Sequence, residues 1–334
     1  MKKTIAVLAA LTMVLSLAAC SNKDGGGNGG EGVNTSSTTS AATTKAENND
    51  DKSDRTEEPE ETAEAATTEL SQPAVEYVEP AAEELTYNYY ENLGGVKITD
   101  YSGDAAAVRF PSELDGEPVK SISLNNKTGV THVELPDSID RIAEYAFSNC
   151  SDLVSIIIPE SVTEIGEFAF YNCTNLTNIN IPDSISVIGD SVFFQCSSLA
   201  GINIPDSVTQ IGAFAFSECI SLTSVNLPDG ITEIGIGTFS GCSSLTGIDL
   251  PDGVAKLMSF AFRDCSSLAE ITLPGGISGI GAETFSGCGS LTNIDIPDSV
   301  ESIGYRAFYE CPGLAVTYKG ETYTQENDPS DWWG

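Results

Sequence analysis

Eight cysteines recur at a constant interval, and by type and spacing they are the residues best suited to chemistry. Each is 23 residues from the next: Cys150, Cys173, Cys196, Cys219, Cys242, Cys265, Cys288 and Cys311. If each interval is one turn of a coil, neighbouring thiols lie about 5 Å apart, within disulfide reach. Zinc needs clustered ligands rather than a line. Because free buried cysteine behaves as a small hydrophobe, we favour an unpaired structural ladder over disulfides.

A second column of the same period is acidic. Its members each follow a proline: Asp137, Glu160, Asp183, Asp206, Asp229, Asp252 and Asp298. Carboxylates suit Ca²⁺, but a calcium site needs about six to eight oxygens, which isolated turn residues rarely supply. The column therefore predicts solvated turns, with weak calcium binding as the alternative.

Composition excludes several classes of function. The chain has 49 acidic residues against 15 Lys and Arg, with a net charge of −34, which is unsuited to neutralising nucleic-acid phosphates. A single histidine, His132, provides no histidine metal cluster and makes a Ser-His-Asp site difficult to build. No phosphate-binding glycine loop or nucleophile elbow is present. We expect no catalytic residue, no metal site, no cofactor and no nucleic-acid partner.

The cysteines belong to a repeating unit that must position every side chain. Prolines, phenylalanines and leucines keep the same interval, as in Pro159 and Pro182, Phe170 and Phe193, or Leu176 and Leu199. Such lock-step periodicity is typical of a solenoid, in which each apolar position lies over its counterpart and forms one continuous core.

One unit illustrates the elements expected in each repeat. Asn178–Ile181 alternates polar and apolar residues, which predicts a short strand. Pro182 ends that strand because it cannot donate to a ladder. Ile185 and Ile188 form a second apolar pair, and residues 192–196 predict a compact turn, written here as one turn of helix. The unit thus has two strand-like sides and one turn.

The repeat motif resembles a known family. It reads Cys-x-x-Leu-x-x-Ile-x-Ile-Pro-x-x-Val-x-x-Ile-Gly-x-x-Ala-Phe and resembles the BspA-like leucine-rich repeats of bacterial surface proteins over Val108–Leu314. The resemblance implies a leucine-rich-repeat solenoid: stacked 23-residue units, a parallel β-sheet on one face and short strand or helical turns on the other. Met258 replaces the usual glycine, as at Gly166, so we infer that this position requires smallness rather than a positive φ.

The remaining segments organise the chain around this array. The N-terminus has Lys2 and Lys3, an apolar run too short to span a membrane, and Leu-Ala-Ala before Cys20, which resembles the lipobox of bacterial lipoproteins. The resemblance implies lipidation of Cys20 and an extracytoplasmic protein, exposed at the cell surface and attached to the bacterial membrane through its lipid alone. The expected organisation is a signal peptide (1–19), a lipidated cysteine with a disordered acidic tether (20–85), an N-terminal cap with a degenerate repeat (86–135), the array (136–314), and a C-terminal hairpin cap and tail (315–334).

Outward positions of the first strand form the candidate binding face, on the expected concave side of the sheet. The candidates are small and polar: Asn178, Asn180, Asn203, Asn226, Asp249, Glu270, Thr272, Asn293 and Asp295. Two interpretations stay open, because stacked amides could serve only the sheet, whereas solenoids commonly bind partners on this side.

The resemblance implies a non-catalytic adhesion module whose partner is an extracellular or cell-surface protein. A neutral polysaccharide ligand, or an accessory role without a tight ligand, are the alternatives. The sequence does not predict the oligomeric state.

Overall fold

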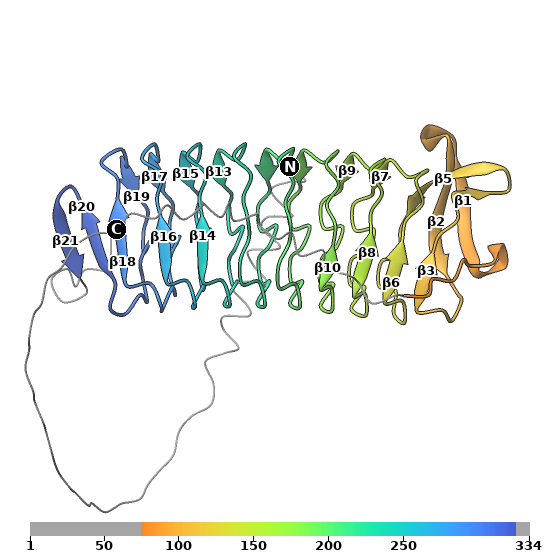
Figure 1. Cartoon of the computed structure of the whole chain (residues 1–334), viewed down its shortest axis with the longest axis horizontal. Coiled ribbons are helices and arrows are strands. Elements are labelled where there is room, and N and C mark those ends of the chain that lie inside the picture. Colours follow the sequence, from red (N-terminus) through yellow and green to blue (C-terminus); the bar gives the residue numbers. More distant parts are fainter. Residues whose placement is uncertain (1–74, 325–334) are drawn as a thin grey trace, which may run out of the picture. The chain divides into compact units, whose positions relative to one another are not determined.

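The computed structural model describes residues 75–324, which form a β-solenoid of stacked repeats. Each repeat has a front strand, a second short strand and a turn segment, so that the strands of successive repeats form two ladders (Figure 1). This is the predicted leucine-rich-repeat solenoid. The signal peptide, Cys20 and the tail after residue 324 lie outside the described residues. Within residues 75–324, no helix combines the length and apolarity needed to cross a membrane.

The front ladder is parallel and keeps the 23-residue register. Its strands are β3 (Ala107–Arg109), β6 (His132–Glu134), β8 (Ser155–Ile157), β10 (Asn178–Ile179), β14 (Gly247–Asp249), β16 (Glu270–Thr272), β18 (Asn293–Ile296) and β20 (Ala315–Tyr318). Ile156 of β8 pairs with Ile179 of β10. Between β10 and β14 the ladder is reduced to a bridge between Asn203 and Asn226, and the pairing is interrupted again between β16 and β18.

The second ladder follows the proline turns. Its two-residue strands are β7 (Arg141–Ile142), β9 (Glu164–Ile165), β11 (Val187–Ile188), β12 (Gln210–Ile211), β13 (Glu233–Ile234), β15 (Lys256–Leu257), β17 (Gly279–Ile280) and β19 (Ser302–Ile303). The Ile185 N–H donates to the Pro182 carbonyl at 3.0 Å, which closes the turn between the two strands. The second apolar pair is confirmed, since Ile185 and Ile188 are both buried.

The turn segment corrects one expectation, because no helix forms in the repeats that the structure describes. Two residues per repeat instead adopt positive φ, such as Phe168 at 58° and Asn172 at 56°. This left-handed conformation costs a non-glycine residue about 1 kcal/mol or more. Successive repeats compensate with backbone bonds: the Phe170 N–H donates to the Val192 carbonyl at 3.0 Å. The turn segments are thus a third hydrogen-bonded side rather than a helical one.

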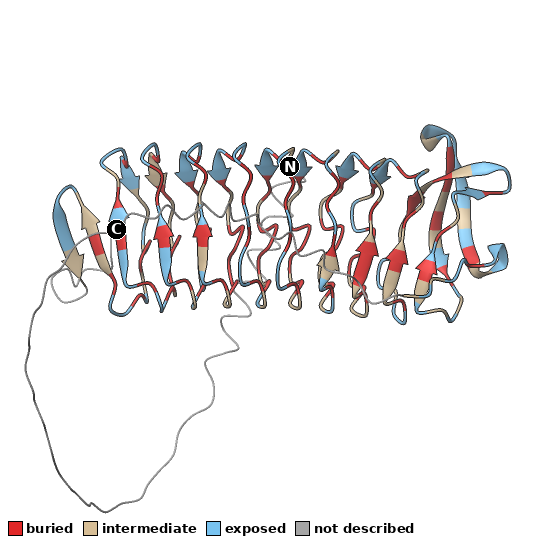
Figure 2. Ribbon diagram, viewed as in Figure 1, coloured by how far each residue is buried: buried red, intermediate tan, exposed pale blue. Residues whose placement is uncertain are grey.

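Stacked phenylalanines form the centre of the core. From Phe147 to Phe308, neighbouring rings lie with centroids 5.4 to 5.7 Å apart and interplanar angles of 3 to 13°. Buried residues line the interior along the whole array, while exposed ones lie at the outer positions (Figure 2). The period therefore places one aromatic layer per repeat, as the sequence predicts.

The cysteine column is free and buried, so the unpaired ladder is confirmed. Each thiol from Cys173 to Cys311 donates to the carbonyl of the phenylalanine 26 residues earlier, as from Cys173 Sγ to the Phe147 oxygen at 3.1 Å. Burial raises the pKa of the Cys150 and Cys311 thiols to about 11. These thiols are structural donors that join neighbouring repeats.

The repeat glycine is required for its size. Gly166 lies outside the left-handed region, and a Cβ on it would lie 2.5 Å from the Glu144 backbone nitrogen. Met258, at the equivalent position, also avoids positive φ. The inference of smallness rather than handedness is therefore confirmed.

Both ends of the array are closed by additional strands. The N-terminal cap contains β1 (Leu85–Tyr90), β2 (Gly95–Tyr101), β4 (Glu113–Leu114) and β5 (Glu117–Ile122), in the sheet order β1-β2-β5-β4, with 3-10 helices η1 (Ala82–Glu84) and η2 (Glu91–Leu93). Val78, N-terminal to the expected cap boundary, bridges to Val108. At the other end, β20 pairs antiparallel with β21 (Glu321–Thr324), which is the predicted hairpin.

Candidate binding face

The front face, meaning the outward side chains of the front strands, is best formed on β14, β16 and β18. Ile248 and Ile271 point into the core, whereas Asp249 and Thr272 are exposed. Register places Asp249 beside Thr272 on the adjacent strand. The strict alternation of each strand therefore brings polar groups from separate repeats onto one surface.

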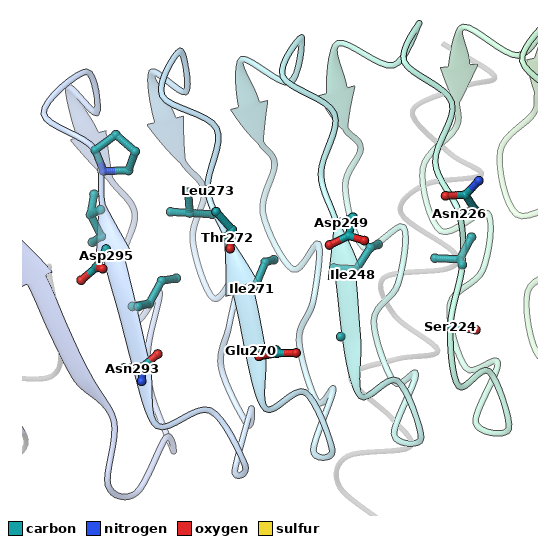
Figure 3. Close-up of a pocket in the computed structure, with 15 residues that line it drawn as sticks. Ser224, Asn226, Ile248, Asp249, Glu270, Ile271, Thr272, Leu273, Asn293 and Asp295 are labelled. Atoms are coloured by element: carbon teal, nitrogen blue, oxygen red, sulfur yellow. The ribbon is translucent and has the colours of Figure 1, made fainter. Parts of the chain in front are cut away.

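These strands form a groove of about 800 Å³, here called the front groove. It gathers six of the nine candidates: Asn226, Asp249, Glu270, Thr272, Asn293 and Asp295 (Figure 3). Ser224 and Gly247 also line it, and their small size leaves space between the larger polar groups. Carboxylates, amides and a hydroxyl thus converge on one hollow that no single repeat could form.

The remaining three candidates lie outside the front groove. Asn180 is committed to the backbone: its Nδ2 donates to the Ile158 carbonyl at 2.7 Å, and its Oδ1 accepts from the Ile158 N–H at 2.9 Å. Asn178 is half-buried in β10, and Asn203 forms the bridge with Asn226. At Asn180, the interpretation that the amide serves only the sheet is correct.

A true amide ladder exists, but in a different column. Asn172 Nδ2 donates to Asn149 Oδ1 at 3.0 Å, and Asn149 Nδ2 donates to Asn126 Oδ1 at 3.1 Å. These residues precede the cysteines on the turn side, where a left-handed backbone favours asparagine. The front-groove amides are therefore not explained by stacking among themselves.

Electrostatically, the front groove belongs to an acidic stretch. Ile142 to Ala255 contains 13 acids and no Lys or Arg. Asp249 also borders an adjoining hollow of about 550 Å³ that Asp229 and Asp252 line. Across residues 75–324, the ion pairs between side chains involve none of the groove acids. A basic or neutral ligand therefore suits this surface best.

The part of the chain that the structure describes contains no group of three or more His, Cys, Asp or Glu residues able to hold a metal ion. The groove carboxylates come from separate repeats and face solvent, where solvation accounts for their charge. The front groove is thus a surface for contact rather than for chemistry at a bound ion.

Sequence reasoning missed the aromatic and arginine side chains outside the front face. On the turn side, Arg306 lies over the rings of Tyr305 and Tyr309, 5.0 and 4.6 Å from their centroids. Tyr145 stacks on Phe168 at 4.8 Å. The signal was available as bulky residues flanking the Ala-Phe pair, but the period alone does not say that they point outward.

Comparison with known proteins matches this geometry. The model of the BspA type leucine-rich repeat region matches residues 119–218 and 187–315, in six copies. The chain belongs to this family. Among solved structures, this BspA-type chain is similar to a leucine-rich repeat protein of T. pallidum, with 36% identity over 64% of this chain and 91% of that one and a TM-score of 0.49.

Two other bacterial structures resemble this BspA-type array. A leucine-rich repeat protein from Bacteroides ovatus is 31% identical over 70% of this chain and 63% of that one, with a TM-score of 0.53. A leucine-rich cell surface protein from Faecalibacterium prausnitzii is 27% identical over 72% of this chain and 76% of that one, with a TM-score of 0.56. Among curated proteins, no sequence matches the chain.

Proposed function

We propose that this protein is a non-catalytic binding module that recognises an extracellular protein through its front groove. The observation that carries the proposal is the convergence of six polar side chains from successive repeats on one hollow of about 800 Å³. The side chains combine acceptors with amide donors, which suits backbone groups and basic side chains of a protein ligand.

The competing ligand class is a neutral polysaccharide. Asparagine and aspartate suit sugar hydroxyls, but no aromatic side chain lines the front groove, so a stacking platform for a sugar ring is missing there. A protein ligand with Lys or Arg at its contact surface is therefore preferred. An accessory role without a tight ligand remains the outcome if nothing binds.

We place the module outside the cytoplasm, attached by a lipid at Cys20. Support comes from the lipobox-like sequence before Cys20 and from the F. prausnitzii relative described as a cell surface protein. The tether before the array would hold the front groove away from the membrane. Labelling with radioactive palmitate that is lost in Cys20→Ala would support the anchor, and equal labelling of both proteins would refute it.

The binding experiment compares two charge-matched variants of the full chain. The groove variant carries Asp249→Arg, Thr272→Arg and Asp295→Arg. The control carries Asp183→Arg, Asn203→Arg and Asp206→Arg, at exposed positions outside the groove with the same total charge change. Immobilised proteins are tested against extracellular-matrix proteins, serum proteins and neutral wall glycans at two salt concentrations.

Saturable binding to a protein, weakened by salt and lost only in the groove variant, is the expected result. Equal loss in both variants would show that overall charge, not the groove, attracts the ligand. Binding of a glycan alone, unaffected by salt, would favour the polysaccharide alternative. No binding across the panel would favour the accessory role.

A further inference from the structure

The strand β1 has a free edge at the N-terminal end of the solenoid. It pairs with β2 on one side and is the terminal strand of its sheet (Figure 1). Across residues 75–324, no other strand pairs with its second edge. Every second residue of such a strand directs its N–H and C=O away from the sheet, where another extended chain can bind them.

The edge lacks the features that usually prevent such pairing. Edge strands are commonly blunted by charges, especially lysine, or by proline. The sequence Leu-Thr-Tyr-Asn-Tyr-Tyr has neither, and its aromatic residues favour extended structure. The one irregularity in its pairing with β2 lies between Thr86 and Tyr87, so that Tyr87–Tyr90 remains regular. The strand is therefore open to a partner along four consecutive residues.

A groove of about 470 Å³ lies beside this edge and is here called the cap groove. Tyr87 and Tyr89 line it from the same face of β1, with Val96 and Leu114 also in its wall. The Tyr87 hydroxyl donates to Asp115 Oδ2 at 2.7 Å, which fixes that ring. The Tyr89 side chain is 55% exposed. One ring is thus held and the other is available for contact.

The charge of the cap groove selects its ligand. Asp115 and Glu117 line it, and no Lys or Arg does. Lys97 is close in sequence but pairs with Asn88, whereas Val96 pairs with Tyr89, so Lys97 projects from the opposite face of the sheet. Tyrosine rings together with carboxylates favour a Lys or Arg side chain.

We propose that β1 and the cap groove bind an extended basic segment of a partner protein. The segment adds a strand to the free edge of β1, and one of its Lys or Arg side chains enters the cap groove between Tyr89 and the carboxylates. Backbone bonds provide affinity in this mode, and side-chain pockets provide specificity. A second copy of this chain fits less well, because pairing two caps would bring Asp115 and Glu117 of both copies close together.

The test uses the full chain and a capped peptide, Lys-Val-Lys-Val-Lys-Val, observed by calorimetry and by nuclear magnetic resonance of the β1 amides. The first control is the same peptide methylated on alternate backbone nitrogens, which keeps the charge and removes strand donors. The second is Tyr89→Ala, matched by Tyr305→Ala, a tyrosine of 50% exposure at the far end of the array. Glu117→Gln tests the carboxylate.

We expect saturable binding, about tenfold weaker for the methylated peptide and about fivefold weaker in Tyr89→Ala and Glu117→Gln, with Tyr305→Ala unchanged. Equal binding of both peptides would overturn the added strand, and unchanged binding in Tyr89→Ala would overturn the cap groove. No binding of the unmodified peptide would refute the proposal. Dimerisation that Tyr89→Ala abolishes and that excludes the peptide would identify a second copy as the occupant and overturn the basic partner.

Discussion

The thiol of Cys219 donates a hydrogen bond to the backbone carbonyl of Phe193, with Sγ and oxygen 3.2 Å apart. The two residues belong to neighbouring repeats, and the same carbonyl accepts the Cys196 N–H at 3.1 Å. One acceptor thus closes a turn within its own repeat and binds the next repeat. The cysteine is selected for a side chain that is small, apolar and still able to donate.

Replacing that thiol should weaken the array. Cys219→Ala removes the donor and leaves space in a closely packed interior, so we expect a loss of about 1–2 kcal/mol in the free energy of unfolding, measured in urea. The neighbouring Ile220 is 46% exposed, and Ile220→Ala should change stability by less than about 0.5 kcal/mol. Equal effects of the two substitutions would contradict the structural role of the thiol.

The thiols should also make stability depend on alkaline pH. Burial raises the pKa of Cys150 and Cys311 from 9.0 to about 11. The unfolded chain therefore releases thiol protons first, and this contribution to stability is complete below pH 9 and is lost as pH rises toward 11. The double variant Cys150→Ala, Cys311→Ala should lose less melting temperature between pH 8 and pH 10.5 than the parent. An identical loss in both proteins would refute this assignment.

Glycine at position 166 should tolerate no side chain. The added Cβ of Gly166→Ala would lie 2.5 Å from the Glu144 nitrogen, which is rigid backbone of the preceding repeat. We expect a cost of about 1–3 kcal/mol. Gly275→Ala is the matched control, because nothing lies within 4 Å of its Cβ position and it should be neutral or slightly stabilising. Thermal unfolding of the two variants tests the difference.

Asn180 and Asn203 should separate structure from recognition. Asn180→Ala removes two hydrogen bonds to the Ile158 backbone, with an expected cost of about 1–3 kcal/mol. Asn203→Ala, one repeat later in the same column and exposed, should leave the urea midpoint nearly unchanged. A stable Asn180→Ala protein would mean that solvent replaces both bonds.

The period alone predicts the fold well, because stacking depends on spacing. Phe170 and Phe193 share a column in the sequence and stack in the molecule. The turn side was wrong, since the spacing from Val192 to Cys196 matches one helical turn. The left-handed backbone at Phe168 is held by bonds to the next repeat, and such non-local bonds are invisible in one unit.

The candidate site was predictable as a column but not as a place. Asn180 and Asp249 occupy equivalent positions, yet one binds backbone and the other lines the front groove. The difference depends on whether the neighbouring strands leave room, as Gly247 does. The cap groove had no periodic signal, because Tyr87 and Asp115 are 28 residues apart outside the array.

Each repeat is bonded to its neighbours by a register of constant step, so a whole unit could be inserted or deleted without altering the local contacts of the others. Such a change would move the N-terminal cap away from the front groove by about 4.8 Å per unit. The repeat number therefore acts as a ruler that sets the separation between two recognition surfaces, and duplication or loss of one coding unit would adjust that separation in fixed increments.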